Sequence, residues 1–146
     1  MAENIFDLYG IGNAIMDLQV RAEDLDLLEL GLTKGAMRLS EPHEQKKIIE
    51  SLETHHPHLA SGGSAANTVI AFSQLGGRTA YGCLVGEDDF GRAYCREMSD
   101  LGVILYTRPI PGKVTGTSVI LITPDAERTM NTHLGVSSEF GPENVS

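Results

Sequence analysis

The sequence predicts an α/β fold in which a mostly parallel sheet is joined to a smaller hairpin of strands. Between Arg78 and Gly102, a short apolar run of strand type is followed by an amphipathic helical pattern. Strand and helix patterns alternate in the same way before this segment, which is the rhythm of a parallel sheet. Further on, "TGTSVILITP", a turn at "DAE" and "RTMNTHLG" have the pattern of two strands joined as a hairpin.

The first 40 residues alternate between strand patterns and glycine breaks. "NIFDLYGIG" and "AIMDLQV" are predicted to form one strand that is kinked at Gly10 and Gly12 and ends at Val20. The acidic, leucine-rich segment 21–35 contains too many glycines for one long helix, and "GAMRLS" after it has the pattern of a short strand.

Three helices are predicted in the middle of the chain. The first has Ser40 as its cap and ends near Thr54. The second follows the glycines of "SGGSAANTVI", and its wide apolar surface predicts burial on most sides. The third is capped by Asp88 or Asp89 and stops at Gly102. The final "SSEFGPENVS" resembles the start of another helix, so we expect the natural protein to continue.

The composition describes one globular domain without the charge of a nucleic-acid binder. The chain has 146 residues, 41% of them hydrophobic, which suffices for a single core. Its formal net charge of -9, with only 11 lysines and arginines, leaves no basic surface to neutralise phosphates. The sequence therefore predicts no nucleic-acid partner.

Nothing in the sequence indicates export or membrane insertion. "MAENIFDLYG" lacks the basic start and apolar run of a signal peptide, and no later stretch is long enough to span a bilayer. Cys83 and Cys95 have neither metal-ligand spacing nor the pattern of a disulfide framework. We therefore expect a soluble, cytoplasmic protein with no membrane partner.

The glycine stretch predicts a site for an anion or a hydroxylated ligand. Gly62 and Gly63 allow close approach to main-chain amides, and the helix start after them offers unpaired N–H groups. A phosphate-binding P-loop needs Lys followed by Ser or Thr, whereas alanines follow Ser64 here, so that interpretation fails. The amide of Asn67, one helical turn later, suits a hydroxylated ligand.

Two charged residues have open interpretations. Asp17, between Met16 and Leu18, could accept hydrogen bonds from the vicinal hydroxyls of a sugar, or it could be a cap or a surface residue. Arg128 could reach a phosphoryl group across a cleft, or it could pair with Glu127 or Asp125 on the turn.

Two other patterns carry weaker hypotheses. Gly10 and Gly12 approach a dinucleotide-binding fingerprint, but the third glycine is missing. The histidines of "HHPHLA" have no nearby carboxylate or thiolate, which favours a solvated linker over a metal site.

Three motifs, in order, resemble those of the ribokinase-type (PfkB-type) carbohydrate kinases. "SGGSAANTVIAFSQLGG" is similar to the family's first signature, "VGEDDFG" to the following strand-to-helix junction, and "TGTSVILITPDAERTM" to its lid strand and hairpin. "GIGNAIMD", "GGSAAN" and "TGT" look most like the adenosine kinase branch. The resemblance implies a ribokinase-like three-layer α/β fold, with helices on both faces of a central, mostly parallel sheet and a small β-sheet lid. Residues 1–146 would be its N-terminal part, with lid segments at about 17–40 and 103–119.

The resemblance also assigns expected roles to individual residues. Arg128 matches the arginine that steadies the transferring phosphoryl group, and no metal ligand is expected. Around the sugar of the acceptor it places Asn13, Asp17, Gly62, Gly63, Ser64 and Asn67. Apolar contacts to the base or the lid fall on Ile15, Met37, Leu39 and Leu134.

The chemistry implied by the resemblance is phosphoryl transfer from ATP, with Mg²⁺, to a primary hydroxyl of a nucleoside or sugar. The family's second signature, Asp-Thr-x-Gly-Ala-Gly-Asp, supplies the catalytic aspartate and much of the nucleotide site, and it does not occur in this chain. We therefore expect the chain alone to be inactive. A homodimer through the lid is a further expectation, and a non-catalytic sugar- or nucleoside-binding module is the alternative.

Overall fold

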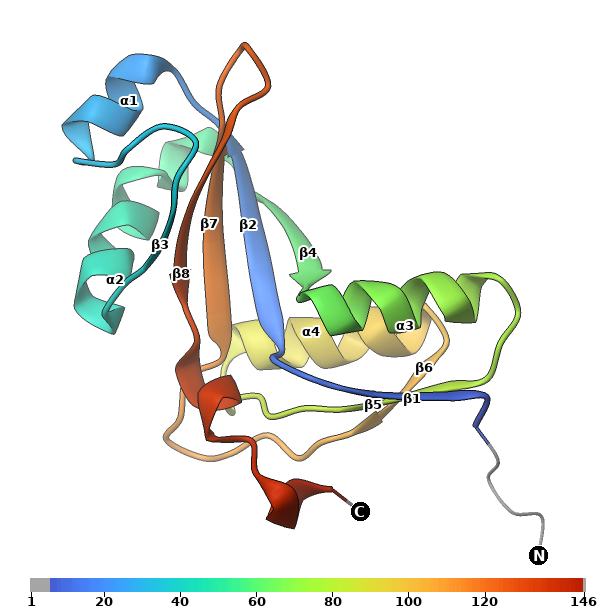
Figure 1. Ribbon diagram of the computed structural model, residues 1–146. Coiled ribbons are helices and arrows are strands. Elements are labelled where there is room, and N and C mark those ends of the chain that lie inside the picture. The colour runs from blue at the N-terminus through green and yellow to red at the C-terminus, as the bar shows by residue number, and fades with distance from the viewer. Residues whose placement is uncertain (1–5, 146) are drawn as a thin grey trace, which may run out of the picture.

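The computed structural model describes residues 6–145, apart from the side chain of Glu53, as two sheets that run in different directions (Figure 1). The smaller sheet is parallel and has the order β1 (Leu8–Ile11), β5 (Thr79–Gly82), β6 (Val103–Tyr106). The larger sheet has the order β3 (Met37–Leu39), β8 (Arg128–His133), β7 (Gly116–Ile122), β2 (Ile15–Arg21), β4 (His58–Gly62). The α/β prediction is confirmed.

The single kinked strand predicted at the N-terminus is wrong, because β1 and β2 belong to different sheets. The chain leaves the parallel sheet at Gly12, where a side chain would have no room. A Cβ there would lie 2.8 Å from the hydroxyl of Tyr81 and 3.1 Å from Cβ of Ala65. The glycine that suggested a kink therefore marks the passage from one sheet to the other.

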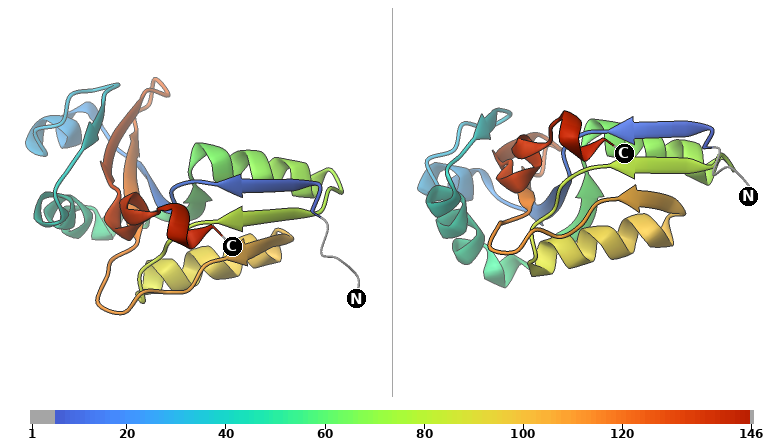
Figure 2. Two further views of the ribbon diagram at one scale, coloured as in Figure 1. Left: turned by 60° about the horizontal axis from the view of Figure 1, so that its bottom comes forward. Right: turned by 90° about the horizontal axis from the view of Figure 1, so that it is seen from below.

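Two helices cover one side of the parallel sheet. α3 (Ser64–Gln74) and α4 (Asp89–Asp100) lie on the same side of it (Figure 2). The core between them and the strands includes Tyr81, Tyr94, Met98, Val69 and Met16, all at most 1% exposed.

The prediction that α3 is buried on most sides is wrong. Among its residues only Ala66 and Val69 are buried, whereas Phe72 is 39% exposed and the C-cap residue Leu75 is 86% exposed. Helix α4 is as predicted: Asp88 is the N-cap and accepts a hydrogen bond from the N–H of Gly91, and Gly102 takes a positive φ of 81° directly after the helix.

The outer face of the larger sheet packs on α1 (Asp24–Glu29) and α2 (Pro42–Ser51). Alternation along the strands sends Val20, Val119 and Leu121 to this face, where they meet Leu27 and Ile48. In Figure 1, α1 and α2 lie on this one side of the strands. Asp17, three residues before Val20 on β2, faces the other side by strand alternation.

The prediction that Ser40 caps α2 is wrong. The N-cap is Glu41, which forms a capping box with Glu44, while the Ser40 hydroxyl donates to Oδ1 of Asn131 at 2.7 Å. A short 3-10 helix, Glu53–His55, follows α2, so the helical stretch extends to the predicted end near Thr54.

The predicted hairpin is confirmed, since β7 and β8 pair antiparallel. The predicted lid segment 103–119 contains strands of both sheets, because Val103–Tyr106 is part of the parallel sheet. The last described residues form two 3-10 helices, Gly135–Glu139 and Pro142–Asn144. Nowhere in residues 6–145 is there a helix of the length and apolarity needed to cross a membrane.

The chain crosses between the sheets three times, and a side chain of β5 or of α4 and its N-cap anchors each crossing. Tyr81 donates to the carbonyl of Asn13 at 3.2 Å. Glu97 accepts from the N–H of Ser61 at 2.7 Å. Asp88 accepts from the N–H of Thr115 at 2.8 Å.

Candidate functional site

Asp17 is a half-buried carboxylate in the middle of the open face of the larger sheet. It lies on β2, with Ala60 of β4 opposite it on one side and Ser118 of β7 on the other. Burial raises the pKa of Asp17, and the positive charge of Arg128 partly offsets that rise. Within residues 6–145, no donor forms a hydrogen bond with its carboxylate. Asp17 is therefore partly desolvated and has acceptor capacity to spare.

Gly62 packs directly against this carboxylate. A Cβ on Gly62 would lie 2.5 Å from Oδ1 and 2.6 Å from Cγ of Asp17, closer than real Cβ atoms approach their neighbours. Gly62 needs no left-handed backbone conformation, so its requirement for glycine comes from this contact alone. The structure thus brings Gly62 and Asp17, two of the residues expected around the sugar, next to each other.

Gly63 turns the chain from β4 into α3. It is the N-cap of the helix with φ of 104°, a conformation that favours glycine, and a Cβ there would lie 2.6 Å from the carbonyl oxygen of Asn13. No side chain caps α3, so its first N–H groups remain available to a ligand. Ser64 and Asn67 are exposed on the first turn, and the N–H of Asn67 closes that turn on the carbonyl of Gly63 at 2.9 Å.

The open face continues from Asp17 across the sheet as a row of residues in register. The row runs from Asp17 to Ser118, Thr132 and Leu39. The hydroxyls of Ser118 and Thr132 are 2.7 Å apart. Sequence reasoning missed both of these residues. Strand alternation in "TGTSVILI" would have placed Ser118 on the face opposite to Val119, but only the register of the sheet places it beside Asp17.

Apolar side chains flank this row. Ile15 and Met37 share the face of Asp17 by strand alternation, and Met37 and Leu39 are 59% and 58% exposed. Ile15 and the main chain of Leu134 both lie against Gly116, where a Cβ would be 2.6 Å from each. The four residues expected to make apolar contacts therefore lie on this face or at its end.

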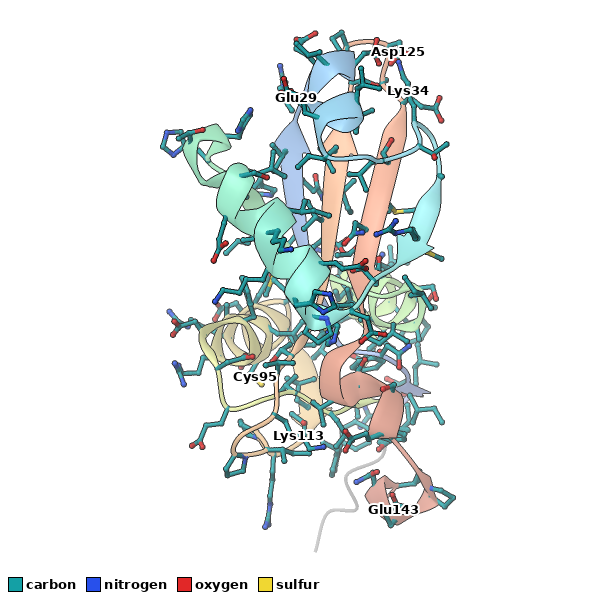
Figure 3. All side chains as sticks on the ribbon, turned by 90° about the vertical axis from the view of Figure 1, so that its left-hand side faces the viewer. Glu29, Lys34, Cys95, Lys113, Asp125 and Glu143 are labelled. Carbon is teal, nitrogen blue, oxygen red and sulfur yellow. The ribbon has the colours of Figure 1, made fainter. Side chains whose placement is uncertain are left out.

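Arg128 begins β8 on the same face, and within the described residues it forms no ion pair. Of the partners considered from sequence, Asp125 is held instead by Lys34 at 2.8 Å and by the Thr123 hydroxyl at 2.6 Å. Lys34 is seen beside Asp125 in Figure 3, and the hydrogen bonds from Lys34 and from the Thr123 hydroxyl lower the pKa of Asp125 to about 2. Arg128 is thus left available for an anion.

The motifs "VGEDDFG" and "TGT" meet in a hydrogen-bond network rather than in the open face. Asp88 accepts from both the N–H and the hydroxyl of Thr115, at 2.8 and 2.7 Å, and the Thr115 hydroxyl accepts from the N–H of Gly86 at 2.9 Å. The network fixes the start of β7, the strand that contributes Ser118 to the row.

No three His, Cys, Asp or Glu side chains in residues 6–145 gather as a metal site. Both cysteines are free; burial raises the pKa of the Cys83 thiol to about 12 and also raises that of Cys95, so neither is a reactive thiolate.

Comparisons with known proteins agree with this architecture. A family model described as "pfkB family carbohydrate kinase" matches residues 27–146. The structure superposes on adenosine kinase from Sinorhizobium meliloti with a TM-score of 0.84 and 40% identity, covering 97% of this chain and 43% of that one. A probable sugar kinase from Rhizobium etli CFN 42 gives a TM-score of 0.84 and 38% identity, covering 97% of this chain and 42% of that one.

The same fold recurs at lower identity. Adenosine kinase from Anopheles gambiae, solved in complex with P1,P4-di(adenosine-5) tetraphosphate, matches with a TM-score of 0.84 and 23% identity over 94% of this chain and 44% of that one. The chain therefore spans less than half the length of these structures. The ribokinase-like fold class and the family resemblance are both confirmed, and the chain belongs to the pfkB family of carbohydrate kinases.

Proposed function

We propose that this chain carries the acceptor site of an ATP-dependent kinase that phosphorylates a primary hydroxyl of a nucleoside. The observation that carries the proposal is the Asp17 carboxylate, which is half-buried, free of hydrogen bonds within residues 6–145 and packed on Gly62 beside the start of α3. Such a carboxylate accepts hydrogen bonds from two vicinal hydroxyls, and these replace the water it has lost.

The surrounding residues complete the acceptor site in this proposal. The first N–H groups of α3, with Ser64, Asn67 and Asn13, contact the remaining ribose oxygens. The exposed side chains of Met37 and Leu39 provide an apolar surface beyond the sugar, which favours a nucleoside such as adenosine over a free sugar.

Arg128 is the one residue of this chain that we assign to phosphoryl transfer. A planar guanidinium without a carboxylate partner suits the oxygens of a phosphoryl group, and it faces the same side of the sheet as Asp17. ATP supplies the phosphoryl group, and Mg²⁺ bound to it neutralises developing charge. We propose that the base, and most of the ATP and Mg²⁺ ligands, lie outside these 146 residues, so that the chain alone binds acceptor without turnover.

Calorimetry with adenosine and ribose tests the acceptor site. Asp17→Asn should weaken both ligands by about tenfold or more, since it removes the charge from two hydrogen bonds. Asp100→Asn, at the exposed end of α4, is the matched control and should bind like the unaltered protein. Unchanged affinity in Asp17→Asn would remove Asp17 from the site.

A second variant separates nucleosides from sugars. Leu39→Ser should weaken adenosine several-fold and leave ribose unchanged, because it alters the apolar surface and not the polyol site. Equal loss for both ligands would contradict the placement of the base. Adenosine binding without ATP-dependent turnover in the natural full-length protein would favour the non-catalytic module.

Two expectations extend the proposal. Among the strands of residues 6–145, β3 lies at the edge of the larger sheet, where its outer main-chain groups are available to a second copy, and we propose a homodimer through this sheet. Light scattering should then give twice the monomer mass of 15.7 kDa, and a monomer would refute it. Cytoplasmic localisation stays a prediction.

A further inference from the structure

Glu97 of α4 accepts hydrogen bonds from both donors of Ser61, the residue that precedes the two glycines of the site. The N–H and the hydroxyl of Ser61 both donate to Oε2 of Glu97, at 2.7 and 2.8 Å. Ser61 is 8% exposed. One turn earlier on α4, the Tyr94 hydroxyl lies 3.4 Å from the carbonyl oxygen of Gly62, at the outer limit of a hydrogen bond.

The contact lies on the free edge of a sheet. Strand β4 is an edge strand whose neighbour on one side is β2, and on the other side no strand follows within the described residues. An apolar side chain over this edge would leave the N–H of Ser61 unpaired, at a cost in free energy. A carboxylate that accepts a main-chain N–H does more, because a short, charge-assisted hydrogen bond fixes the position of one particular residue.

The position that it fixes determines the geometry of the acceptor site. Gly62 follows Ser61 directly and must stay against the Asp17 carboxylate, and Gly63 comes next and starts α3. A displacement of Ser61 therefore shifts the floor of the site relative to Asp17. A shift that breaks one hydrogen bond between the ligand and a charged group of the site weakens binding by about tenfold or more.

We propose that Glu97 is a positioning residue of the acceptor site, acting through Ser61 on Gly62 and Gly63. The proposal rests on the proposed function, because the ligand whose binding it affects is the nucleoside. It adds a residue on the far side of β4 that touches no part of the ligand. Loss of Glu97 lets the end of β4 move away from β2, so that the amides of α3 and the carboxylate of Asp17 no longer engage one ribose together.

The test combines a ligand-free measurement with a binding measurement. Glu97→Ala removes both hydrogen bonds to Ser61. It should speed amide hydrogen exchange at Ser61 by about tenfold, the factor expected from losing the one charge-assisted bond of that N–H, and weaken adenosine, measured by calorimetry, by about tenfold. Glu97→Gln keeps an oxygen that accepts the same bonds and should stay within about threefold of the unaltered protein.

Two further variants serve as controls. Ser73→Ala removes a different link between α3 and α4, the 3.0 Å hydrogen bond to the Leu101 carbonyl, and should change neither Ser61 exchange nor adenosine affinity. Ser61→Ala keeps the N–H bond, so it should fold even if Glu97→Ala does not, and its loss of affinity should be smaller. The losses of adenosine affinity in Glu97→Ala and Ser61→Ala should be non-additive when the two substitutions are combined, because both act on one contact.

The outcomes separate this proposal from the proposed function. If the unaltered protein binds adenosine and Glu97→Ala binds it equally well, the role of Glu97 is refuted and the acceptor site stands. A Ser73→Ala variant as weak as Glu97→Ala would also refute it, since the loss would then reflect helix packing in general. If the unaltered protein does not bind adenosine, the acceptor site itself is wrong and this proposal fails with it.

Discussion

Gly62→Ala tests the contact between the glycine stretch and Asp17 with a single methyl group. A Cβ at this position would lie 2.5 Å from Oδ1 of Asp17, whereas ordinary contact begins at 3.4 Å. The carboxylate must therefore retreat by roughly 0.9 Å, the difference between these distances. The backbone of Gly62 is not in the left-handed region, so alanine adds no strain of its own.

The consequence should be large for binding and small for stability. The hydrogen bonds from the ligand hydroxyls to the displaced carboxylate are then lost, which corresponds to about 100-fold weaker acceptor binding. The short side chain of Asp17 can rotate away, so the cost in unfolding free energy stays near the lower end for overpacking, about 1 kcal/mol, or about 3 °C in Tm. Calorimetry with adenosine and thermal unfolding of the same variant measure both quantities.

Gly76→Ala is the matched control. Gly76 has φ of 94°, and a Cβ added there would meet no atom within 4 Å, so alanine strains the backbone by about 1–2 kcal/mol without touching the site. We expect it to lower Tm at least as much as Gly62→Ala and to bind adenosine normally. Normal binding by Gly62→Ala, or an equal loss of binding in both variants, would refute the reasoning.

Three further predictions concern charged residues. Burial raises the pKa of Asp17 in the folded protein, so the free energy of unfolding falls as pH rises from 3.8 through that raised pKa. Asp17→Asn should therefore increase Tm at pH 7 but not below pH 3.8. An equal gain in Tm at both pH values would contradict the burial of an ionised Asp17. Arg128→Ala should lower kcat of the natural full-length protein by about 10³ with a much smaller change in acceptor binding, and normal turnover would remove Arg128 from the mechanism. Lys34→Met should raise the pKa of Asp125 from about 2 toward 3.8, which NMR titration measures. It should also lower kcat, because Asp125 then competes with the phosphoryl group for Arg128, and adding Asp125→Asn should restore kcat. No change in the pKa of Asp125 or in kcat would refute this.

The sequence predicted the secondary structure well wherever a local signal determines it. Helix α4 has its cap at Asp88 and its stop at Gly102, and the β7–β8 hairpin has its turn, as expected. The sequence could not show that β1 and β2 belong to different sheets, because strand periodicity carries no information about which strands pair. Burial of α3 was overestimated for a related reason, since apolar content does not tell which side of a helix a neighbour covers.

The site was predictable in part. Glycines at 62 and 63 indicated close approach, and the structure places Asp17 against the first of them. Ser118 and Thr132 were missed because the row that joins them to Asp17 depends on register between three strands. Glu97 gave no signal at all, since an acidic residue on an amphipathic helix is ordinary, and its contact with Ser61 exists only in the tertiary structure.

The three anchored crossings limit how the larger sheet can move. Tyr81 of β5, Glu97 of α4 and the α4 N-cap Asp88 each hold a different crossing, close to the ends of β2, β4 and β7. Because the larger sheet is held at three places along one edge, it cannot slide as a rigid body. It can enclose a ligand only if the free ends of its strands bend. The bending should be largest at the far end of the sheet, where Arg128 follows the β7–β8 turn. A bound acceptor should therefore reduce relaxation dispersion in NMR more strongly at this turn than near Ser61.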